Sequence, residues 1–253
     1  MLSSAAVIQA GDRPVTALRG VGSSENPSPC ETCSVRKESF CNVLIRSSVQ
    51  SPTLTQCHET AARRKMLFET EALGERVFAI CNGWAFRFRR FEDGRRYILN
   101  FLIAGDFVFG AFSDYPAFSL QALTDIRFCE FVHTEVKTRI LEEPRAYDAW
   151  IEARIAEPAE LAATAASLAH SNAAERIAQL ILHLRDRLER RGMVQNESFA
   201  FPLRQSHIAD ATGLTPVHVS RTIGAFRKDG VLALDDGKLT FNLAKLRRVG
   251  NRR

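Results

Sequence analysis

The stretch from Arg204 to Phe226 constrains the fold more than any other part of the sequence, because it places a tight turn between two short amphipathic segments. Gly213 suits the left-handed residue that ends a helix. Thr215 is suited to the N-cap of a second helix, and Pro216 to its first position, where no N–H is needed. The pattern therefore predicts two short helices joined by a sharp turn.

The second of these helices has one apolar face and one polar face. Its inward face repeats at positions i, i+4 and i+7, through Val219, Ile223 and Phe226. A capped helix after a tight glycine turn is typical of the helix-turn-helix, whose second helix enters the DNA major groove. Arg221 is suited to a bidentate guanine contact, and Ser220 to a base or a phosphate. The predicted DNA-binding residues are Val217, His218, Ser220 and Arg221, although His218 equally suits a position against the first helix or in solvent.

Two further features of the C-terminal third favour DNA binding. Residues 231–234 and 239–241 flank the turn sequence Asp235-Asp236-Gly237-Lys238 and predict a β-hairpin wing. From Arg185 onward the chain has 14 Lys and Arg against 7 Asp and Glu, although its net charge over 253 residues is only +5. A basic module attached to a near-neutral remainder suits a partner rich in phosphate.

Upstream, short strands between turn signals predict a small antiparallel barrel or jelly roll. Asn82-Gly83 is a strong hairpin signal between strands at 77–81 and 84–91. In the second strand Trp84, Phe86 and Phe88 alternate with Ala85, Arg87 and Arg89, the period of a half-buried strand. Further strands are expected at 97–103, 107–109, 120–124 and 127–133.

After Pro144 the sequence is rich in Ala, Leu, Glu and Arg, with no glycine until Gly192, and is expected to be helical. Pro158 either starts a new helix or kinks one. An apolar stripe in this region either packs on the chain's own barrel or pairs with a second copy; it consists of Leu161, Leu168, Ile177, Leu180, Ile181, Leu184 and Leu188.

These patterns predict an α+β protein with five consecutive parts. They are a disordered N-terminus (1–29), a cysteine-containing arm (30–57), a β-barrel (58–143), a dimerisation helix region (144–185) and a winged helix-turn-helix domain (186–253).

Composition narrows the class of protein. No apolar run approaches the roughly 20 residues of a membrane-spanning helix, and the N-terminus lacks the features of a signal peptide. We therefore expect a cytoplasmic protein without membrane contact. The sequence contains no Ser/His/Asp grouping, phosphate loop or paired carboxylate motif, and its six histidines are scattered, so an enzyme is not expected.

Cys30, Cys33 and Cys41 bring three of the six cysteines into 12 residues. A metal site, a disulfide staple and chance are the three interpretations. Thiols stay reduced in the cytoplasm, so clustered cysteines there favour metal or redox chemistry over structural disulfides.

The order of barrel, long helix and winged helix-turn-helix resembles the Crp/Fnr superfamily of bacterial transcription regulators. The segments NFLIAGDFVFG, NAAERIAQLILHL and GLTPVHVSRTIGAFRKDGVL resemble family segments in the expected order, and the similarity covers roughly residues 60–245. The resemblance implies a barrel like a cyclic-nucleotide-binding domain, a long dimerisation helix and a homodimer. It also implies binding to double-stranded promoter DNA and contact with RNA polymerase.

Crp-type members of this family bind cyclic AMP through a Gly-Glu pair and a later Arg-Ser pair. Residues 107–121, which follow the Gly105-Asp106 turn, contain no Gly-Glu pair and no arginine. A buried phosphate without a cationic partner is costly. We therefore expect no binding of cyclic AMP.

The cysteine arm resembles the FNR/FnrN-like subgroup, in which three N-terminal cysteines and one barrel cysteine hold a [4Fe-4S] cluster. The resemblance implies Cys30, Cys33, Cys41 and Cys129 as ligands, and a cluster that promotes dimerisation and promoter binding at low oxygen. Tetrahedral zinc or an arm without any metal are the alternatives. Cys81 is interpreted as barrel core, and Cys57 as incidental or as a substitute for Cys129.

The recognition helix departs from the subgroup at one position. Its members carry a glutamate where this chain has Val217, and that glutamate accepts a hydrogen bond from cytosine. Valine has no acceptor, although it can pack on a thymine methyl group. Recognition of the subgroup's TTGA half-site is therefore in doubt, whereas a guanine contact by Arg221 is still expected.

Overall fold

The computed structural model describes residues 33–37, 39–45, 56–68, 77–109 and 118–250. These residues belong to one compact unit that begins at Cys33. The predicted disordered segment 1–29 and the proposed ligand Cys30 lie outside the described residues.

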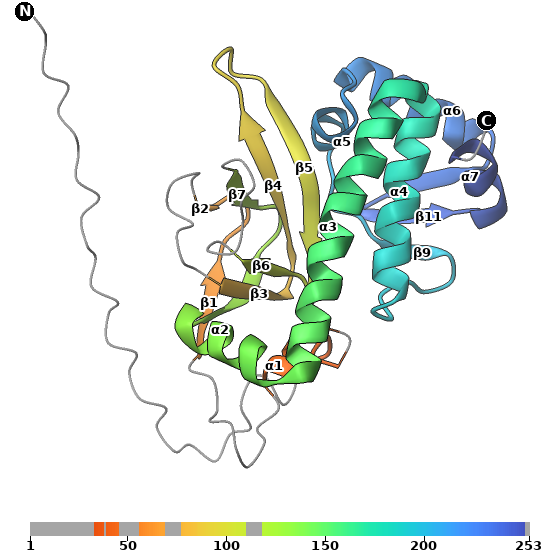
Figure 1. Cartoon of the computed structure of the whole chain (residues 1–253). Helices are drawn as coiled ribbons and strands as arrows, with labels where there is room; N and C mark the ends of the chain where they lie inside the picture. The colour runs from red at the N-terminus through yellow and green to blue at the C-terminus, as the bar shows by residue number, and fades with distance from the viewer. Residues whose placement is uncertain (1–32, 38, 46–55, 69–76, 110–117, 251–253) are drawn as a thin grey trace, which may run out of the picture. The chain divides into compact units, whose positions relative to one another are not determined.

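Two antiparallel sheets of four strands each form the N-terminal half of this unit (Figure 1), as the strand pattern predicted. Sheet A has the order β1-β8-β3-β6 and sheet B the order β2-β7-β4-β5. The strands are β1 (Gln56–Ala61), β2 (Met66–Phe68), β3 (Val77–Asn82), β4 (Trp84–Arg90), β5 (Arg96–Ile103), β6 (Phe107–Phe109), β7 (Ser119–Ala122) and β8 (Ile126–Phe131).

Alternate residues of each strand fill the space between the two sheets. Phe78 and Ile80 of β3, Leu120 of β7 and Phe128 of β8 belong to this core. The hairpin between β3 and β4 depends on Gly83, whose φ is +87° and whose added Cβ would lie 2.3 Å from the backbone oxygen of Asp125. Only glycine fits that turn, because both the conformation and the space exclude a side chain.

The prediction of a half-buried strand at 84–91 is wrong for β4. Ala85 lies in the core between the sheets, and Arg87, on the same face, is only 8% exposed. Trp84, Phe86 and Phe88, on the other face, pack into a second core with side chains from the C-terminal helices. The strand is therefore buried on both faces, because helices cover the side of sheet B that would otherwise meet water.

The helices and the C-terminal sheet follow the order that the sequence indicated. The helices are α1 (Cys41–Leu44), α2 (His133–Glu142), α3 (Pro144–His170), α4 (Ala173–Glu189), α5 (Gln205–Thr212), α6 (Pro216–Lys228) and α7 (Leu243–Gly250). A small sheet of order β10-β11-β9 completes the fold, with β9 (Ser198–Ala200), β10 (Leu232–Asp235) and β11 (Lys238–Phe241). No helix in the described ranges is both long and apolar enough to cross a membrane.

The helical region contains two helices, and neither starts at Pro158. α3 continues through Pro158, and α4 begins at a capping box formed by Asn172 and Glu175. The apolar stripe is divided between them. On α4 its residues Ile177, Ile181, Leu184 and Leu188 are at most 1% exposed within the chain's own core. This part of the stripe is therefore core, and it is not available to a second copy.

A buried ion cluster joins the N-terminal sheets to α4. Arg187 of α4 and Arg191, which follows the C-cap of α4, both donate to the carboxylate of Asp106, in the turn between β5 and β6. Arg187 also donates to the carbonyl of Phe101, and Arg191 to that of Ala104, at 2.8 Å each. Burial raises the pKa of Asp106, but the two guanidinium groups outweigh burial and hold that pKa below its usual value.

We predict that Asp106→Asn lowers the free energy of unfolding by about 3 kcal/mol at neutral pH, because it leaves the buried guanidinium of Arg187 and the half-buried guanidinium of Arg191 without a counter-charge. The contribution of Asp106 is present above the pKa of an unfolded aspartate, about 4, and is lost as pH falls through the lower folded pKa. The wild type should therefore lose this stability in acid, whereas the variant has none of it to lose.

Urea unfolding between pH 2.5 and 7 measures both effects. The matched control is Asp93→Asn, which removes an exposed ion pair with Arg95 and should leave stability nearly unchanged. Equal behaviour of the two variants would contradict the prediction.

Candidate nucleic-acid interface and thiol site

The turn between α5 and α6 has the geometry that the sequence predicted. Gly213 ends α5 in the left-handed conformation, with φ of 64° and ψ of 30°. The hydroxyl of Thr215 accepts from the backbone N–H of His218 at 3.3 Å, and Pro216 is the first residue of α6. A side-chain cap and a glycine C-cap therefore fix the directions of both helices.

The two faces of α6 are also divided as predicted. Val219, Ile223 and Phe226 are buried against α5 and the small sheet. The structure brings the four predicted DNA-binding residues onto the exposed face of the first two turns of α6; they are Val217, His218, Ser220 and Arg221. Val217 is 58% exposed, so its side chain is accessible to a partner. The four side chains are therefore accessible on one face of the helix.

The wing is present and contains one strand more than the sequence predicted. β10 and β11 are joined by Asp236 and Gly237, with φ of 44° and 74°, as a two-residue hairpin requires. β9 pairs with β11, and it was not predicted from the sequence, although the alternation of the buried Phe199 and Phe201 indicates a strand.

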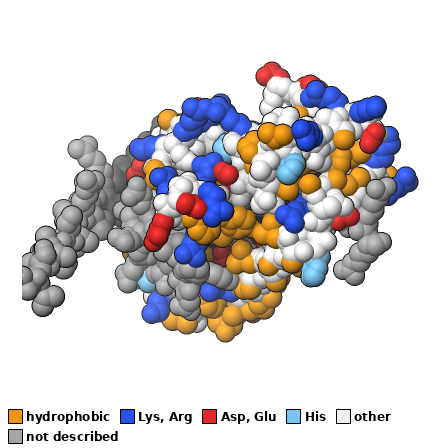
Figure 2. Space-filling model, turned by 90° about the horizontal axis from the view of Figure 1, so that it is seen from above, with side chains coloured by type: hydrophobic (Ala, Val, Ile, Leu, Met, Phe, Trp, Pro, Cys, Tyr) orange, Lys and Arg blue, Asp and Glu red, His pale blue; other side chains and the backbone are white. Residues whose placement is uncertain are grey.

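On the face of the molecule seen in Figure 2, Lys and Arg side chains outnumber Asp and Glu side chains.

Sheet B positions α5, the first helix of the pair. Arg96 of β5 forms an ion pair with Asp210 at 2.7 Å, and the ring of His207 lies 5.6 Å from that of Phe86. Burial and the nearby charge of Arg96 lower the pKa of His207 to about 4. His207 is therefore neutral at neutral pH, and its Nδ1 accepts from the backbone N–H of Arg204 at 3.1 Å.

The described part of the arm, residues 33–37 and 39–45, covers the outer face of sheet A. The ring of Phe40 lies 5.2 Å from that of Phe107 and 5.7 Å from that of Phe109, both on β6. Phe107 in turn stacks on Phe131 of β8 at 5.9 Å. Cys41, the first residue of α1, follows Phe40 directly and is buried.

Cys129 belongs to the same face of sheet A. Ala79 of β3 lies opposite Phe107 on one side and opposite Cys129 on the other, and directly opposed residues share a face of a sheet. Cys129 is 2% exposed. Its thiol is therefore directed to the layer that the arm occupies, and away from the core between the sheets.

The interpretation of Cys81 as barrel core is wrong. Cys81 is only half-buried, and its Sγ lies 3.0 Å from the Sγ of Cys129. Cys81 therefore stands beside a proposed ligand, a position that sequence spacing alone did not indicate.

The remaining predicted ligands are separate or undescribed. Cys33 lies in a turn of the arm and is half-buried. Cys30 lies outside the described residues, as does the side chain of Cys57. Within the described ranges, no three His, Cys, Asp or Glu side chains lie close enough together to hold a metal ion. The thiols of Cys81 and Cys129 are in direct contact.

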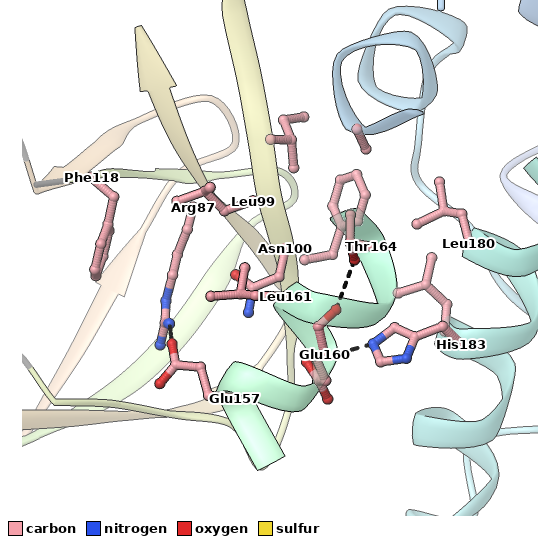
Figure 3. Close-up of a pocket in the computed structure, with 14 residues that line it drawn as sticks. Arg87, Leu99, Asn100, Phe118, Glu157, Glu160, Leu161, Thr164, Leu180 and His183 are labelled. Carbon is pink, nitrogen blue, oxygen red and sulfur yellow. Dashed lines mark hydrogen bonds and ion pairs between the residues drawn. The ribbon is translucent and has the colours of Figure 1, made fainter. Parts of the chain in front are cut away.

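A separate pocket lies between β5, α3 and α4 (Figure 3). Arg87 is the one guanidinium among its described lining residues; it forms an ion pair with Glu157 and lies 4.9 Å over the ring of Phe118. Across the pocket His183 lies 3.7 Å from Glu160, and burial, followed by the charge of Arg187, lowers the pKa of His183. The charge of Arg87 is thus already offset by a carboxylate. The absence of cyclic AMP binding stays a prediction.

Comparison with known proteins agrees with this architecture. A family model described as a Crp-like helix-turn-helix domain matches residues 175–249. The chain is 25% identical over 212 residues to the nitrogen fixation regulation protein FixK of Bradyrhizobium diazoefficiens, covering 83% of this chain and 89% of that protein. It is 26% identical over 245 residues to the fumarate and nitrate reduction regulatory protein of Yersinia pestis, covering 92% and 95%.

Solved structures show the same fold. FixK2 from Bradyrhizobium japonicum superposes with a TM-score of 0.70 at 19% identity, covering 79% of this chain and all of that one. A CooA mutant from Carboxydothermus hydrogenoformans gives a TM-score of 0.63 at 20% identity, covering 78% and 88%.

We predict that Arg221→Ala weakens binding to a DNA site selected by the wild-type protein by about 10- to 100-fold, the cost of one lost bidentate guanine contact. Binding to a scrambled duplex should change much less, because Arg221 is expected to read a base edge. The matched control is Lys238→Ala in the wing, which should weaken both duplexes alike. Fluorescence anisotropy at fixed salt measures all four affinities; equal losses on both duplexes for Arg221→Ala would contradict a base contact.

Proposed function

Because the chain is a transcription regulator of the Crp/Fnr type, we propose that its binding to promoter DNA responds to oxygen through a [4Fe-4S] cluster. The ligands are the thiolates of Cys30, Cys33, Cys41 and Cys129. Four thiolates are the donor set that such a cluster takes. When bound, the cluster supplies an oxygen-sensitive redox centre between the arm and sheet A.

The observation that carries the proposal is the packing of the arm on the face of sheet A that bears Cys129. The contacts of Phe40 with Phe107 and Phe109 hold the chain next to Cys41 against that face. A C-x₂-C pair upstream, Cys30 and Cys33, can then complete a set of four thiolates with one ligand from the sheet. The donor chemistry and the common face fit the group.

The arm also lies next to the helix that would respond to it. Phe40 and Val43 line one groove together with Ala149 and Ala153 of α3. Figure 1 shows α1 close to the start of α3. A change in how the arm sits on sheet A therefore alters the packing at one end of α3.

α3 has an exposed apolar face suited to a second copy of the chain. Exposed positions alternate in steps of four and three residues along it, as in a coiled-coil seam; they are Ile155, Ala159, Ala162, Ala166 and Ala169. We infer a cytoplasmic homodimer that pairs through this face. Its two α6 helices would meet half-sites about one helical turn apart on promoter DNA, beside RNA polymerase.

The second candidate function keeps the DNA-binding module and omits the cluster. Tetrahedral zinc accepts the same four thiolates. The direct contact of Cys81 with Cys129 is compatible with an arm that holds no metal at all. Iron content separates these cases.

Protein purified without oxygen should be brown, absorb broadly near 400 nm, and contain about four irons per chain. Its DNA affinity should fall on exposure to air, because loss of the cluster frees the arm. Cys30→Ser should remove both the iron and the oxygen response while leaving a folded protein. The matched control, Cys57→Ser, should retain both. Colourless protein containing zinc, or iron-free protein that binds DNA equally well in air, would contradict the proposal.

We predict that Ile155→Glu raises the dissociation constant of the dimer at least about tenfold, because it places two like charges in the apolar seam. Ile155 is 66% exposed in the single chain. The matched control is Leu141→Glu on α2, where the leucine is 70% exposed and lies outside the seam. Sedimentation equilibrium measures both; a dimer unaffected by Ile155→Glu would place the interface elsewhere.

A further inference from the structure

The strand that carries Cys81 is irregular at that residue. Ile80 of β3 lies opposite Phe128 of β8, and Asn82 lies opposite Arg127. Two steps along β3 therefore correspond to one step along β8, and Cys81 is the extra residue of a β-bulge. Bulges interrupt the hydrogen-bond ladder locally, and they are enriched beside functional sites.

Cys81 follows Ala79 by two residues and shares its face of sheet A, where its side chain meets Cys129. Its Sγ lies 3.0 Å from the Sγ of Cys129 and 3.8 Å from the carbonyl oxygen of Ala79. A disulfide bond is about 2.05 Å long. The two sulfur atoms are thus about 1 Å from bonding distance, a gap that side-chain rotation can close while the register of the sheet is kept.

The two thiols differ in access to solvent. Cys81 is half-buried, whereas Cys129 is 2% exposed. A dissolved reagent therefore reaches Cys81 first. The Sγ of Cys129 on β8 lies 3.0 Å from that of Cys81, so it is placed to attack Cys81 once Cys81 has reacted with that reagent.

We propose that Cys81 and Cys129 are a reversible dithiol pair, which closes to a cross-strand disulfide when the metal-free protein meets a small-molecule disulfide. The pair itself does not depend on the proposed function. Its consequence does, because a closed disulfide removes Cys129 from the proposed ligand set and blocks reassembly of the cluster until the bond is reduced.

The chemistry is thiol–disulfide exchange in two steps. The thiolate of Cys81 attacks one sulfur of a disulfide such as oxidised glutathione and releases one thiol, leaving a mixed disulfide. The thiolate of Cys129 then attacks the sulfur of Cys81 and releases the second thiol. Two protons and two electrons leave the pair of cysteines, and the small disulfide is reduced to two thiols.

The test uses the full-length chain freed of metal and reduced, then exposed to oxidised glutathione without oxygen. After remaining thiols are alkylated, digestion and mass spectrometry identify the crosslinked peptides. We expect the peptide pair joining Cys81 to Cys129 to predominate, and to disappear after treatment with a dithiol reductant. A population in which Cys129 pairs chiefly with Cys30, Cys33 or Cys41 would overturn the proposal, as would one in which Cys81 stays reduced.

Two variants complete the experiment. Cys81→Ser should form no crosslink at Cys129, and once oxidised glutathione has been removed it should rebind iron without prior reduction, whereas the wild type should need the reductant. The matched control, Cys57→Ser, should behave like the wild type. If Cys81→Ser instead fails to hold iron in protein never exposed to an oxidant, Cys81 is a ligand and the proposed exchange partner is wrong.

The failure of this inference and that of the proposed function can be told apart. A crosslink in a protein that never binds iron supports the dithiol pair and rejects the cluster. A protein that binds iron, but whose metal-free form gives no crosslink between Cys81 and Cys129, supports the cluster and rejects the dithiol pair.

Discussion

The contact of Asp106 with Arg187 and Arg191 is the interaction on which the arrangement of the fold depends. It closes the turn after β5 and at the same time fixes α4, whose apolar face supplies the core of the DNA-binding domain. A buried carboxylate between two guanidinium groups tolerates little displacement, because each charge is costly without the other. This ion cluster therefore restricts the movement of α4 relative to the N-terminal sheets, in addition to the covalent connection between them.

Local signals were sufficient for the DNA-binding half. Gly213, Thr215 and Pro216 specify their own backbone conformations, and the spacing of Val219, Ile223 and Phe226 identifies the buried face of α6. The resemblance to the Crp/Fnr superfamily and the α+β fold are confirmed, and both rested on such signals. Motifs of this kind can be predicted because neighbours in sequence supply most of the interactions.

The errors of prediction concern residues whose environment comes from distant segments. The alternation of β4 predicted that one face of the strand is exposed to solvent. Helices that lie more than eighty residues later in the sequence cover that face. Cys81 was interpreted as barrel core, but it lies on the outer face of sheet A beside Cys129, a residue 48 positions away in the sequence. The resemblance to the Crp/Fnr superfamily implied Cys129 as a ligand, a role that stays a prediction, and it gave no indication of the thiol of Cys81 beside it.

Pro158 has a consequence for any dimer built on α3. It has no N–H to offer the carbonyl of Arg154, so α3, the longest helix among the described residues, lacks one of its own hydrogen bonds near its midpoint. A helix yields most easily where its ladder is interrupted. In such a dimer, each α3 helix would therefore bend most easily at Pro158. The two ends of the helix–helix interface could then move apart or together independently, while the register between the helices is kept.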